Sequence, residues 1–267
     1  MKRINTSTGI EIAYREFGTP TQDVPVILVH GMGGDSSTWE RFARTLVRHG
    51  RHVIAPDLRG HGRSARAVSY RFAEFGEDLV ALCKELGLDR VDMLGHSLGG
   101  HAATVAEQCR PGLVRRLVLE EAPIPLRPGD PEQSFAGRFP SVPELWHATT
   151  SLVRHPRAVF AFDRTMTGTA LEQFRMPNPP WWDALRDISS DTLILRGGPR
   201  GMVDPDRLEA VTDVVARVRV ESFSCGHSIH RDRFREFAAA VVPFLTEPEE
   251  PFHTESADSG LREADPD

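Results

Sequence analysis

The sequence predicts an α/β fold, in which a mostly parallel central sheet carries helices on both faces and a small helical cap is added. Three observations support this fold class. Short apolar runs typical of buried strands alternate with segments whose apolar residues recur at helical spacing. Glycine-containing loops follow several of these runs. One stretch rich in proline and aromatic residues interrupts the alternation, which predicts an excursion from the sheet.

The predicted strands and helices are spread along most of the chain. Residues 10–14 alternate apolar and polar side chains, a pattern typical of an edge strand. Further strands are expected at residues 25–30, 52–56, 91–95, 114–119, 192–196 and 218–223. Apolar residues at a period of 3.6 predict helices that start near Trp39, Phe72 and Phe234.

The expected organisation is one core domain with an inserted cap. Residues 1–122 and 187–245 are predicted to form the core, and residues 123–186 the cap. The cap contains Trp146 and Trp181, and aromatic residues outside a regular sheet either fill a satellite core or line a ligand cavity. Both tryptophans are therefore candidate substrate-binding residues.

The charge and composition exclude several classes of partner. The net charge is −6, and residues 246–267 carry eight acids against one base, or −7, so the rest of the chain is nearly neutral. We expect this acidic tail to be disordered and no nucleic acid to bind. No run approaches 18 apolar residues and no signal peptide is apparent, which predicts a soluble cytoplasmic protein without a membrane partner. The scattered Cys83, Cys109 and Cys225 predict reduced thiols.

A serine lies between two glycines directly after the predicted strand at residues 91–95. The segment reads Gly95, His96, Ser97, Leu98, Gly99 and is followed by a helix-like stretch. A sharp strand-to-helix turn forces the serine into a strained conformation, and the flanking glycines avoid collision. The helix N-terminus favours negative charge beside the hydroxyl. Ser97 is therefore predicted to be a nucleophile.

Three more segments occur in an order that a known family shares. Residues 26–34 combine an apolar strand with a glycine-rich loop, residues 54–64 combine the next strand with its turn, and residues 226–227 are a Gly-His pair near the C-terminus. Together with the turn at Ser97, they give a chain that resembles the α/β-hydrolase fold family over roughly residues 9–245. The resemblance implies a serine hydrolase whose cap covers the active site.

The resemblance implies that His227 is the general base. A serine hydroxyl is a poor nucleophile unless a base, usually an imidazole oriented by a carboxylate, lies within hydrogen-bond reach. His227 follows the predicted strand at residues 218–223, as the family's histidine does, and His230 is the main alternative. The resemblance also implies that His30 shapes the glycine-rich loop, and His30 and Gly31 are candidate substrate-binding residues.

The carboxylate that would orient the histidine has two candidate locations. The usual acidic position of the family falls on Gly201, and the nearby Asp204 precedes a proline in the pattern of a helix N-cap. Some relatives place the acid after the strand that follows the nucleophile's helix, where this chain has Glu120 and Glu121. Because neighbouring residues of a strand face opposite sides, one of the two glutamates can point at the histidine. Glu121 is preferred, with Asp204 as the alternative acid.

The expected chemistry is two-step acyl transfer to water. The backbone N–H groups of Met32 and Leu98 are the predicted oxyanion hole. The nearly balanced charges of the cap indicate a small-molecule substrate that is uncharged and fairly apolar, such as an ester, a lactone or a related carbonyl compound. This places the enzyme among the carboxylesterases and lactonases.

Other functions stay open at this point. The same scaffold hosts several chemistries, so a carbon–carbon bond hydrolase, a perhydrolase, and a non-catalytic binding or receptor protein are alternatives. No phosphate-binding loop, zinc-protease motif or paired-cysteine ligand set occurs, and neither a cofactor nor a metal is expected. The sequence leaves the oligomeric state open.

Overall fold

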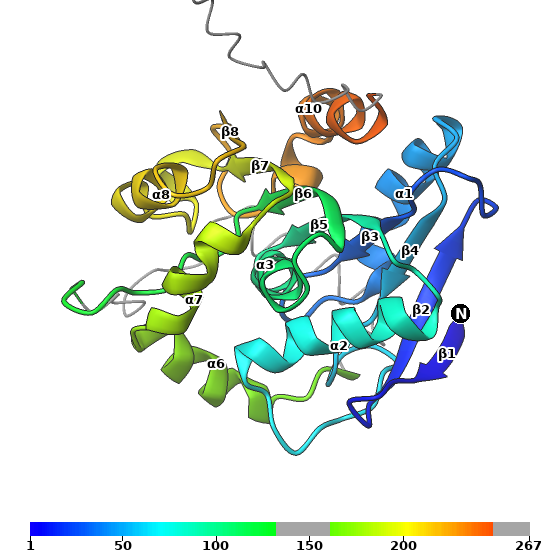
Figure 1. Cartoon of the computed structure of the whole chain (residues 1–267), viewed down its shortest axis with the longest axis horizontal. Helices are drawn as coiled ribbons and strands as arrows, with labels where there is room; N and C mark the ends of the chain where they lie inside the picture. Colours follow the sequence, from blue (N-terminus) through cyan, green and yellow to red (C-terminus); the bar gives the residue numbers. More distant parts are fainter. Residues whose placement is uncertain (132–160, 248–267) are drawn as a thin grey trace, which may run out of the picture.

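The computed structural model describes residues 1–131 and 161–247, and this part of the chain folds around one eight-stranded sheet (Figure 1). The strand order is β1-β2-β4-β3-β5-β6-β7-β8. β2 pairs antiparallel with β1 and β4, and the remaining neighbours pair in parallel. The predicted mostly parallel sheet is therefore confirmed.

The strands coincide with most of the predicted apolar runs. They are β1 (Lys2–Asn5), β2 (Glu11–Phe17), β3 (Val26–Val29), β4 (Val53–Pro56), β5 (Val91–His96), β6 (Val114–Glu120), β7 (Asp191–Arg196) and β8 (Val218–Ser222). The edge position expected for residues 10–14 is wrong, because β1 pairs with β2 and forms the edge itself. β1 has no apolar alternation to reveal it, since only Ile4 in its middle is apolar.

Helices cover both faces of the sheet, as predicted. They are α1 (Glu40–Arg48), α2 (Phe72–Glu85), α3 (Leu98–Cys109), α6 (Thr165–Arg175), α7 (Pro179–Asp183), α8 (Pro205–Thr212), α9 (Ile229–Asp232) and α10 (Phe234–Thr246), with short 3₁₀ turns η1 (Ser36–Trp39), η2 (Ala184–Asp187) and η3 (Gly198–Arg200). Along β5, Met93 packs with α2 and α3, whereas Leu94 packs with α1 and α10. This alternation of side chains makes two cores, one on each face.

The predicted cap lies partly within the described residues. α6, α7 and η2 occupy its second half, and α7 begins after Asn178, whose side chain caps it, with Pro179 at the first helical position. Leu126 and Pro177 form an isolated bridge that joins the segment after β6 to this half. Trp146 and most of the acidic tail lie outside the described residues, so the proposed cap and tail boundaries stay predictions.

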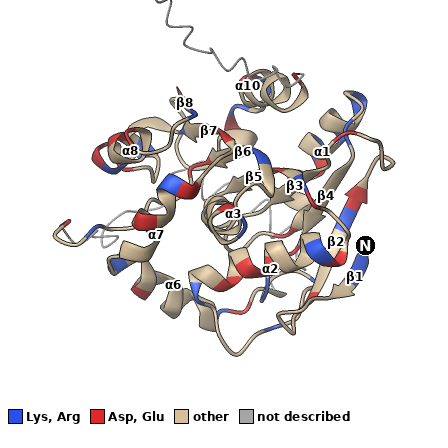
Figure 2. Cartoon of the chain, in the orientation of Figure 1, with Lys and Arg blue, Asp and Glu red and all other residues tan. Residues whose placement is uncertain are grey.

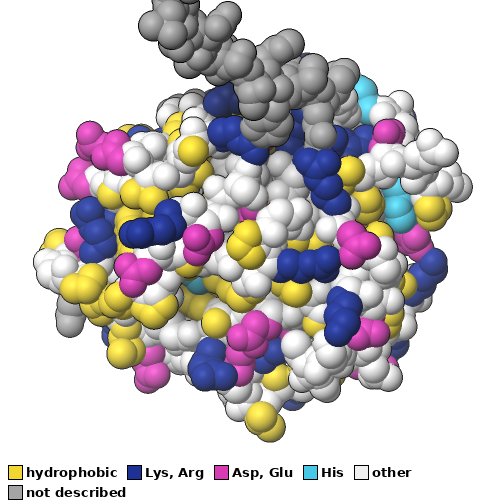
Figure 3. Space-filling model, in the orientation of Figure 1, with side chains coloured by type: hydrophobic (Ala, Val, Ile, Leu, Met, Phe, Trp, Pro, Cys, Tyr) yellow, Lys and Arg dark blue, Asp and Glu magenta, His cyan; other side chains and the backbone are white. Residues whose placement is uncertain are grey.

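Charged side chains are mixed by sign over the molecule. Acidic and basic residues alternate along the ribbon (Figure 2), and on the face in Figure 3 they are interspersed with apolar side chains. This face therefore presents no extended surface of one sign. Within residues 1–131 and 161–247, no helix is long and apolar enough to cross a membrane.

Candidate active site

Ser97 stands at a sharp turn between β5 and α3. Its backbone lies in the left-handed region, with φ 52° and ψ −121°, which non-glycine residues rarely adopt. The turn leaves no room for side chains at Gly95 and Gly99. A Cβ atom at Gly95 would collide with the backbone of Gly99, and a Cβ atom at Gly99 would collide with the backbone of Val29. These are the features expected of a turn that presents a nucleophilic hydroxyl at a helix N-terminus.

The glycine-rich loop after β3 lies directly against this turn. A Cβ atom at Gly31 would be 3.2 Å from the Ser97 Cβ and 2.7 Å from His96 Nδ1, so the close approach requires glycine. Met32 follows Gly31, and Leu98 begins α3, where the first N–H groups have no partner inside the helix. The two predicted oxyanion donors therefore belong to the two segments that meet at Ser97.

Two fully buried histidines, His30 and His61, form hydrogen bonds with the backbone of this loop. His30 Nδ1 lies 2.8 Å from the carbonyl of Gly31, and its Nε2 accepts from the N–H of Leu58 at 3.0 Å. His61 Nε2 accepts from the N–H of Gly33 at 3.1 Å, and its Nδ1 lies 2.9 Å from a carbonyl two residues earlier. Each ring donates at one nitrogen and accepts at the other, which requires the neutral form. Burial lowers the pKa of both rings, that of His61 to about 3.

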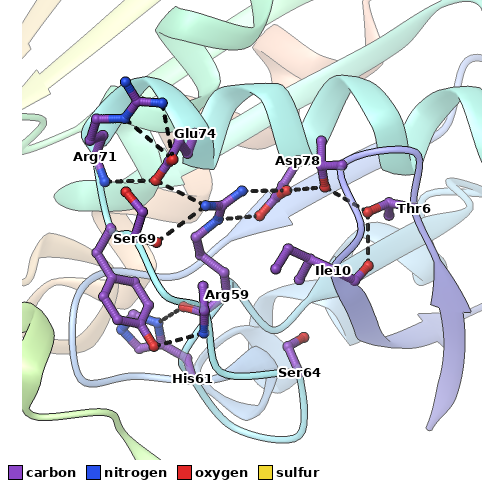
Figure 4. Close-up of polar contacts among 12 residues, drawn as sticks. Thr6, Ile10, Arg59, His61, Ser64, Ser69, Arg71, Glu74 and Asp78 are labelled. Carbon is purple, nitrogen blue, oxygen red and sulfur yellow. Dashed lines mark hydrogen bonds and ion pairs between the residues drawn. The ribbon is translucent and has the colours of Figure 1, made fainter.

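The segment that carries His61 is itself fixed to α2 by a buried arginine (Figure 4). Arg59 donates from Nε and Nη2 to the two carboxylate oxygens of Asp78, at 2.7 and 2.8 Å. Its Nη1 lies 3.0 Å from Glu74 Oε2. Bidentate, charge-assisted contacts of this kind are among the strong ones in proteins. The position of the glycine-rich loop therefore depends, through His61, on α2.

Glu121 and His227 meet beside this turn. Glu121 directly follows β6 and has a positive φ of 49°, which turns its fully buried side chain away from the direction the strand would give it. The carboxylate accepts from the N–H groups of Gly197 and Met202. His227 Nδ1 lies 3.5 Å from Glu121 Oε2, within reach of an ion pair but without hydrogen-bond alignment. Among the described residues Nδ1 has no hydrogen-bond partner.

The Glu121 carboxylate lies beside Gly201, the position where the family usually has its acid. A Cβ atom at Gly201 would collide with both carboxylate oxygens of Glu121, so the carboxylate fills the space where a side chain from position 201 would project. Asp204 caps α8 instead, because its side chain accepts from the N–H of Arg207 at 3.0 Å and pairs with that guanidinium at 3.4 Å. Of the two candidate acids, the geometry brings Glu121 to His227.

The neighbouring glutamate makes a second carboxylate–histidine pair. Glu120 accepts from the backbone N–H of His230 at 2.8 Å, and its two oxygens lie 2.9 and 2.8 Å from His230 Nδ1. Both side chains are buried, at 0% and 4% exposure, and the His230 ring packs 4.6 Å from Trp39. Burial raises the pKa of the Glu120 carboxyl. Glu120 and Glu121 thus engage different histidines, Glu120 from the end of β6 and Glu121 from the turn that follows it.

His96 lies between the two histidines of these pairs. Its ring centroid is 4.7 Å from that of His227 and 5.1 Å from that of His230, and its Nε2 lies 2.7 Å from the carbonyl of His227. Burial lowers its pKa well below the usual value, so the ring is neutral. Since His96 immediately precedes Ser97, this contact attaches the His227 loop to the serine turn. Within the described part of the chain, His227 contacts His96, the residue before Ser97, and no hydrogen bond joins Ser97 to His227.

One group of side chains could be considered for a metal ion. Possible ligand atoms of His96, Glu120 and His230 lie within 4.8 Å of one another in the part of the chain that the structure describes. In the structure these groups bond to other protein groups: the Glu120 carboxylate accepts from the backbone N–H and the ring of His230, and His96 Nε2 donates to the carbonyl of His227. This arrangement favours a hydrogen-bonded network over a metal site.

The remaining candidate residues lie in different surroundings in the structure. Trp181 is 6% exposed and belongs to the core, with its ring stacked 6.0 Å from that of His101. His30 is buried under the loop, whereas the Met32 side chain is 40% exposed beside it. The roles of His61 and of the Glu120–His230 pair were not predicted from the sequence. No local pattern identifies them, because their partners come from other loops and strands.

The fold and this arrangement of residues define an α/β hydrolase. A family model described as the alpha/beta hydrolase fold matches residues 24–192, and the chain belongs to this family.

Relatives of several activities share the fold. The chain is 29% identical to a 2-hydroxy-6-oxo-2,4-heptadienoate hydrolase of Pseudomonas putida, over 92% of this chain and 99% of that protein. It is 26% identical to the sn-1-specific diacylglycerol lipase ABHD11 of Mus musculus, over 82% and 80% of the two chains. The crystal structure of a hydrolase from Pseudomonas aeruginosa PA01 is similar with a TM-score of 0.76 over 92% and 98% of the chains, at 24% identity.

Proposed function

We propose that this α/β hydrolase is a serine hydrolase that works through an acyl-enzyme. The observation that carries the proposal is the strained turn at Ser97, at the start of α3 and against the Gly31 loop, with the Glu121–His227 pair beside it. In this proposal His227 removes the proton of Ser97, and Glu121 orients the imidazole and stabilises its charged form. His227 gives this proton to the leaving group as the acyl-enzyme forms, and the neutral ring later takes a proton from the water that releases the acid.

The oxyanion that forms during attack would accept from the N–H groups of Met32 and Leu98. A donor of this kind contributes about 3 kcal/mol of transition-state stabilisation. Because both donors are backbone groups, their placement depends on the segments around them. The neutral rings of His30 and His61 support one of these segments, and the helix α3 provides the other.

Closing of the site on substrate is part of this mechanism. The Ser97 hydroxyl and the His227 ring share no hydrogen bond among the described residues, and the Glu121 contact is 3.5 Å long. Catalytic hydrogen bonds are often long without substrate and tighten in the complex. His227 keeps 20% of its side chain exposed, which leaves the ring accessible to a reacting group.

The substrate we propose is an uncharged and fairly apolar ester, lactone or related carbonyl compound. The lipase relative supports ester hydrolysis. Carbon–carbon bond hydrolysis is the second candidate, because two relatives are named as 2-hydroxy-6-oxo-2,4-heptadienoate hydrolase and 2-hydroxymuconate semialdehyde hydrolase. The same nucleophile and base would serve either reaction.

A substrate screen tests the proposal. Nitrophenyl esters of increasing chain length, lactones and 2-hydroxy-6-oxo-2,4-heptadienoate would be compared with wild-type protein and Ser97→Ala. We expect turnover of at least one ester or lactone that Ser97→Ala loses, with the dienoate as the weaker substrate. A preference for the dienoate would favour the second candidate. Activity that survives in Ser97→Ala, or no turnover of any compound, would contradict the proposal and favour a binding protein.

A further inference from the structure

The two edge strands of the sheet differ in the charges that they carry. β1 and β8 stand at opposite ends of the strand order, and within residues 1–131 and 161–247 each pairs with a strand on one side only. In Figure 1, β8 lies at the margin of the sheet, with α8 on one side and α10 on the other. An edge strand presents backbone N–H and C=O groups to which another strand can bind, and charged side chains often prevent this.

The charges of β1 are already engaged inside the molecule. This strand carries two bases, Lys2 and Arg3, and no acid. Both bases form ion pairs with glutamates of the neighbouring strand β2, Lys2 with Glu16 and Arg3 with Glu11. A second strand placed against β1 would therefore find no acid to pair with its bases.

β8, in contrast, carries exposed side chains of opposite charge. Arg219 and Glu221 are two residues apart, so they project from the same face of the sheet. The Arg219 guanidinium lies 5.0 Å from the centre of the Phe244 ring of α10. Within the described part of the chain, no ion pair involves Arg219 or Glu221. Val220 between them is 39% exposed. The strand thus presents one base, one acid and an apolar side chain to solvent.

β8 also directs backbone groups away from the sheet. The N–H of Thr192 in β7 donates to the carbonyl of Arg217, and the N–H of Phe223 donates to the carbonyl of Arg196. Since alternate residues of a strand bond to the same neighbour, residues 217, 219, 221 and 223 face β7. The N–H and C=O groups of residues 218, 220 and 222 therefore point to the open side of β8.

We propose that β8 is a dimerisation edge whose partner is β8 of a second copy of this chain, paired antiparallel about a twofold axis at Val220. In this register Val220 faces its own copy, Val218 faces Ser222, and Arg219 faces Glu221. The backbone groups that point outward belong to the residues that would exchange hydrogen bonds across the axis. Arg219 and Glu221 fall at the positions between these bonds, where opposite side chains approach most closely.

The charges of β8 select this register. A twofold axis at Arg219 would place two arginines opposite each other, and an axis at Glu221 would do the same with two glutamates. Like charges directly opposite destabilise a strand pair, whereas opposite charges stabilise it. An axis between two residues would set an outward-facing residue against one that faces β7, which breaks the hydrogen-bond pattern. The order Arg219, Val220, Glu221 is therefore complementary to itself, as a twofold interface requires.

Charge reversal tests the proposed pairing. Sedimentation velocity at increasing protein concentration would give the dimer dissociation constant. Arg219→Glu and Glu221→Arg each place like charges opposite one another, and each should raise this constant at least about tenfold. The double variant Arg219→Glu/Glu221→Arg restores opposite charges in reversed order and should dimerise within about threefold of wild type. Arg186→Glu, at another exposed arginine, is the matched control and should leave the constant unchanged.

A mixture of the two single variants gives a second test. Arg219→Glu presents two acids on β8 and Glu221→Arg presents two bases, so each variant repels its own copy and complements the other. An equimolar mixture should contain the heterodimer in excess of both homodimers. Native mass spectrometry resolves the three dimers because they differ in mass. An interface that lacks these two residues does not predict this preference.

Four results would overturn the proposal. They are wild-type protein that stays monomeric up to about 0.5 mM, a dimer that Arg219→Glu leaves intact, a double variant as weak as the single variants, and a mixture without excess heterodimer. The pairing does not involve Ser97, so all measurements can be made with Ser97→Ala in the background. Failure of this interface and failure of the proposed hydrolase function are therefore distinguishable.

Discussion

Two neighbouring glutamates at the end of β6 each meet a histidine, and the two pairs differ in the distance between their side chains and in the exposure of the histidine. Glu120 and His230 are joined by contacts of 2.8 to 2.9 Å and are almost fully buried. Glu121 and His227 are 3.5 Å apart, and a fifth of the His227 side chain is exposed. A buried pair joined by short hydrogen bonds stabilises a fold, whereas an accessible imidazole is suited to moving a proton.

The largest effect expected from this difference is on turnover when each histidine is removed. His227→Ala should lower kcat/KM at least about 10³-fold, because it removes the proposed general base, with unfolding free energy changed by less than about 1 kcal/mol. His230→Ala should lower the unfolding free energy by about 2–4 kcal/mol, because it leaves a cavity and buried oxygens with fewer donors. Steady-state kinetics and urea unfolding of both variants check this. A larger loss of kcat/KM in folded His230→Ala than in His227→Ala would indicate that His230 is the general base.

The next effect concerns the carboxylates. Glu121→Gln should reduce turnover about 10²- to 10⁴-fold, since the amide cannot stabilise a protonated His227. Asp204→Ala should cost about 1 kcal/mol of stability through loss of the α8 cap and leave turnover nearly unchanged. The comparison is made on the folded fraction of each variant, measured by circular dichroism. If Asp204→Ala lost turnover and Glu121→Gln kept it, the assignment of the acid would be wrong.

Moving the acid to position 201 should sharpen the same comparison. The Glu121→Gly variant empties the space into which a side chain at position 201 would point, and a glycine in place of Glu121 tolerates the positive φ. We therefore expect Glu121→Gly/Gly201→Asp to recover at least about tenfold of the turnover that Glu121→Gly loses. Gly201→Asp alone should be destabilised, because its Cβ would collide with the Glu121 carboxylate. No recovery in the double variant would show that position 201 cannot reach His227.

The smallest effect is on stability and distinguishes the glycine-rich loop, to which His61 hydrogen-bonds, from both carboxylate–histidine pairs. His61 has a folded pKa of about 3, below its value of 6.5 in the unfolded chain. The unfolded state therefore binds more protons, and stability that is complete above pH 6.5 is lost as the pH falls toward 3. The shifted pKa of His61 should therefore lower the unfolding free energy by about 2 kcal/mol between pH 7 and pH 5. Urea unfolding at both pH values checks this, and His61→Gln should lose less stability over the same interval. An equal loss in the variant would contradict the neutral ring at His61.

Much of the fold was predictable from the sequence because buried parallel strands leave continuous apolar runs. Residues 26–29 and 91–96 are buried, and their apolar runs were sufficient to find them. β1 was not predictable, since a short, exposed edge strand has almost no apolar residues and depends on pairing with β2. The break in alternation predicted an excursion from the sheet, and α6 and α7 lie between β6 and β7, while the cap itself stays a prediction.

The candidate site was predictable where a residue follows a strand in a recognisable loop. Ser97, His227 and Glu121 belong to this group. The sequence predicted that the side chains of Glu120 and Glu121 point in different directions. It did not reveal the positive φ at Glu121, which sets the direction of that side chain. His61 could not be found, since its role depends on a bond to Gly33, 28 residues away in another loop.

The rate at which a fluorophosphonate modifies Ser97 tests the central claim most directly. Intact-mass measurements would follow the adduct in wild-type protein, His227→Ala and His230→Ala, with Ser97→Ala as the blank. If His227 activates the Ser97 hydroxyl, one adduct forms on wild-type protein, modification of His227→Ala is slower by at least about 10²-fold, and folded His230→Ala reacts within about tenfold of wild type. Equal rates in wild-type protein and His227→Ala, or an adduct on Ser97→Ala, would contradict the account.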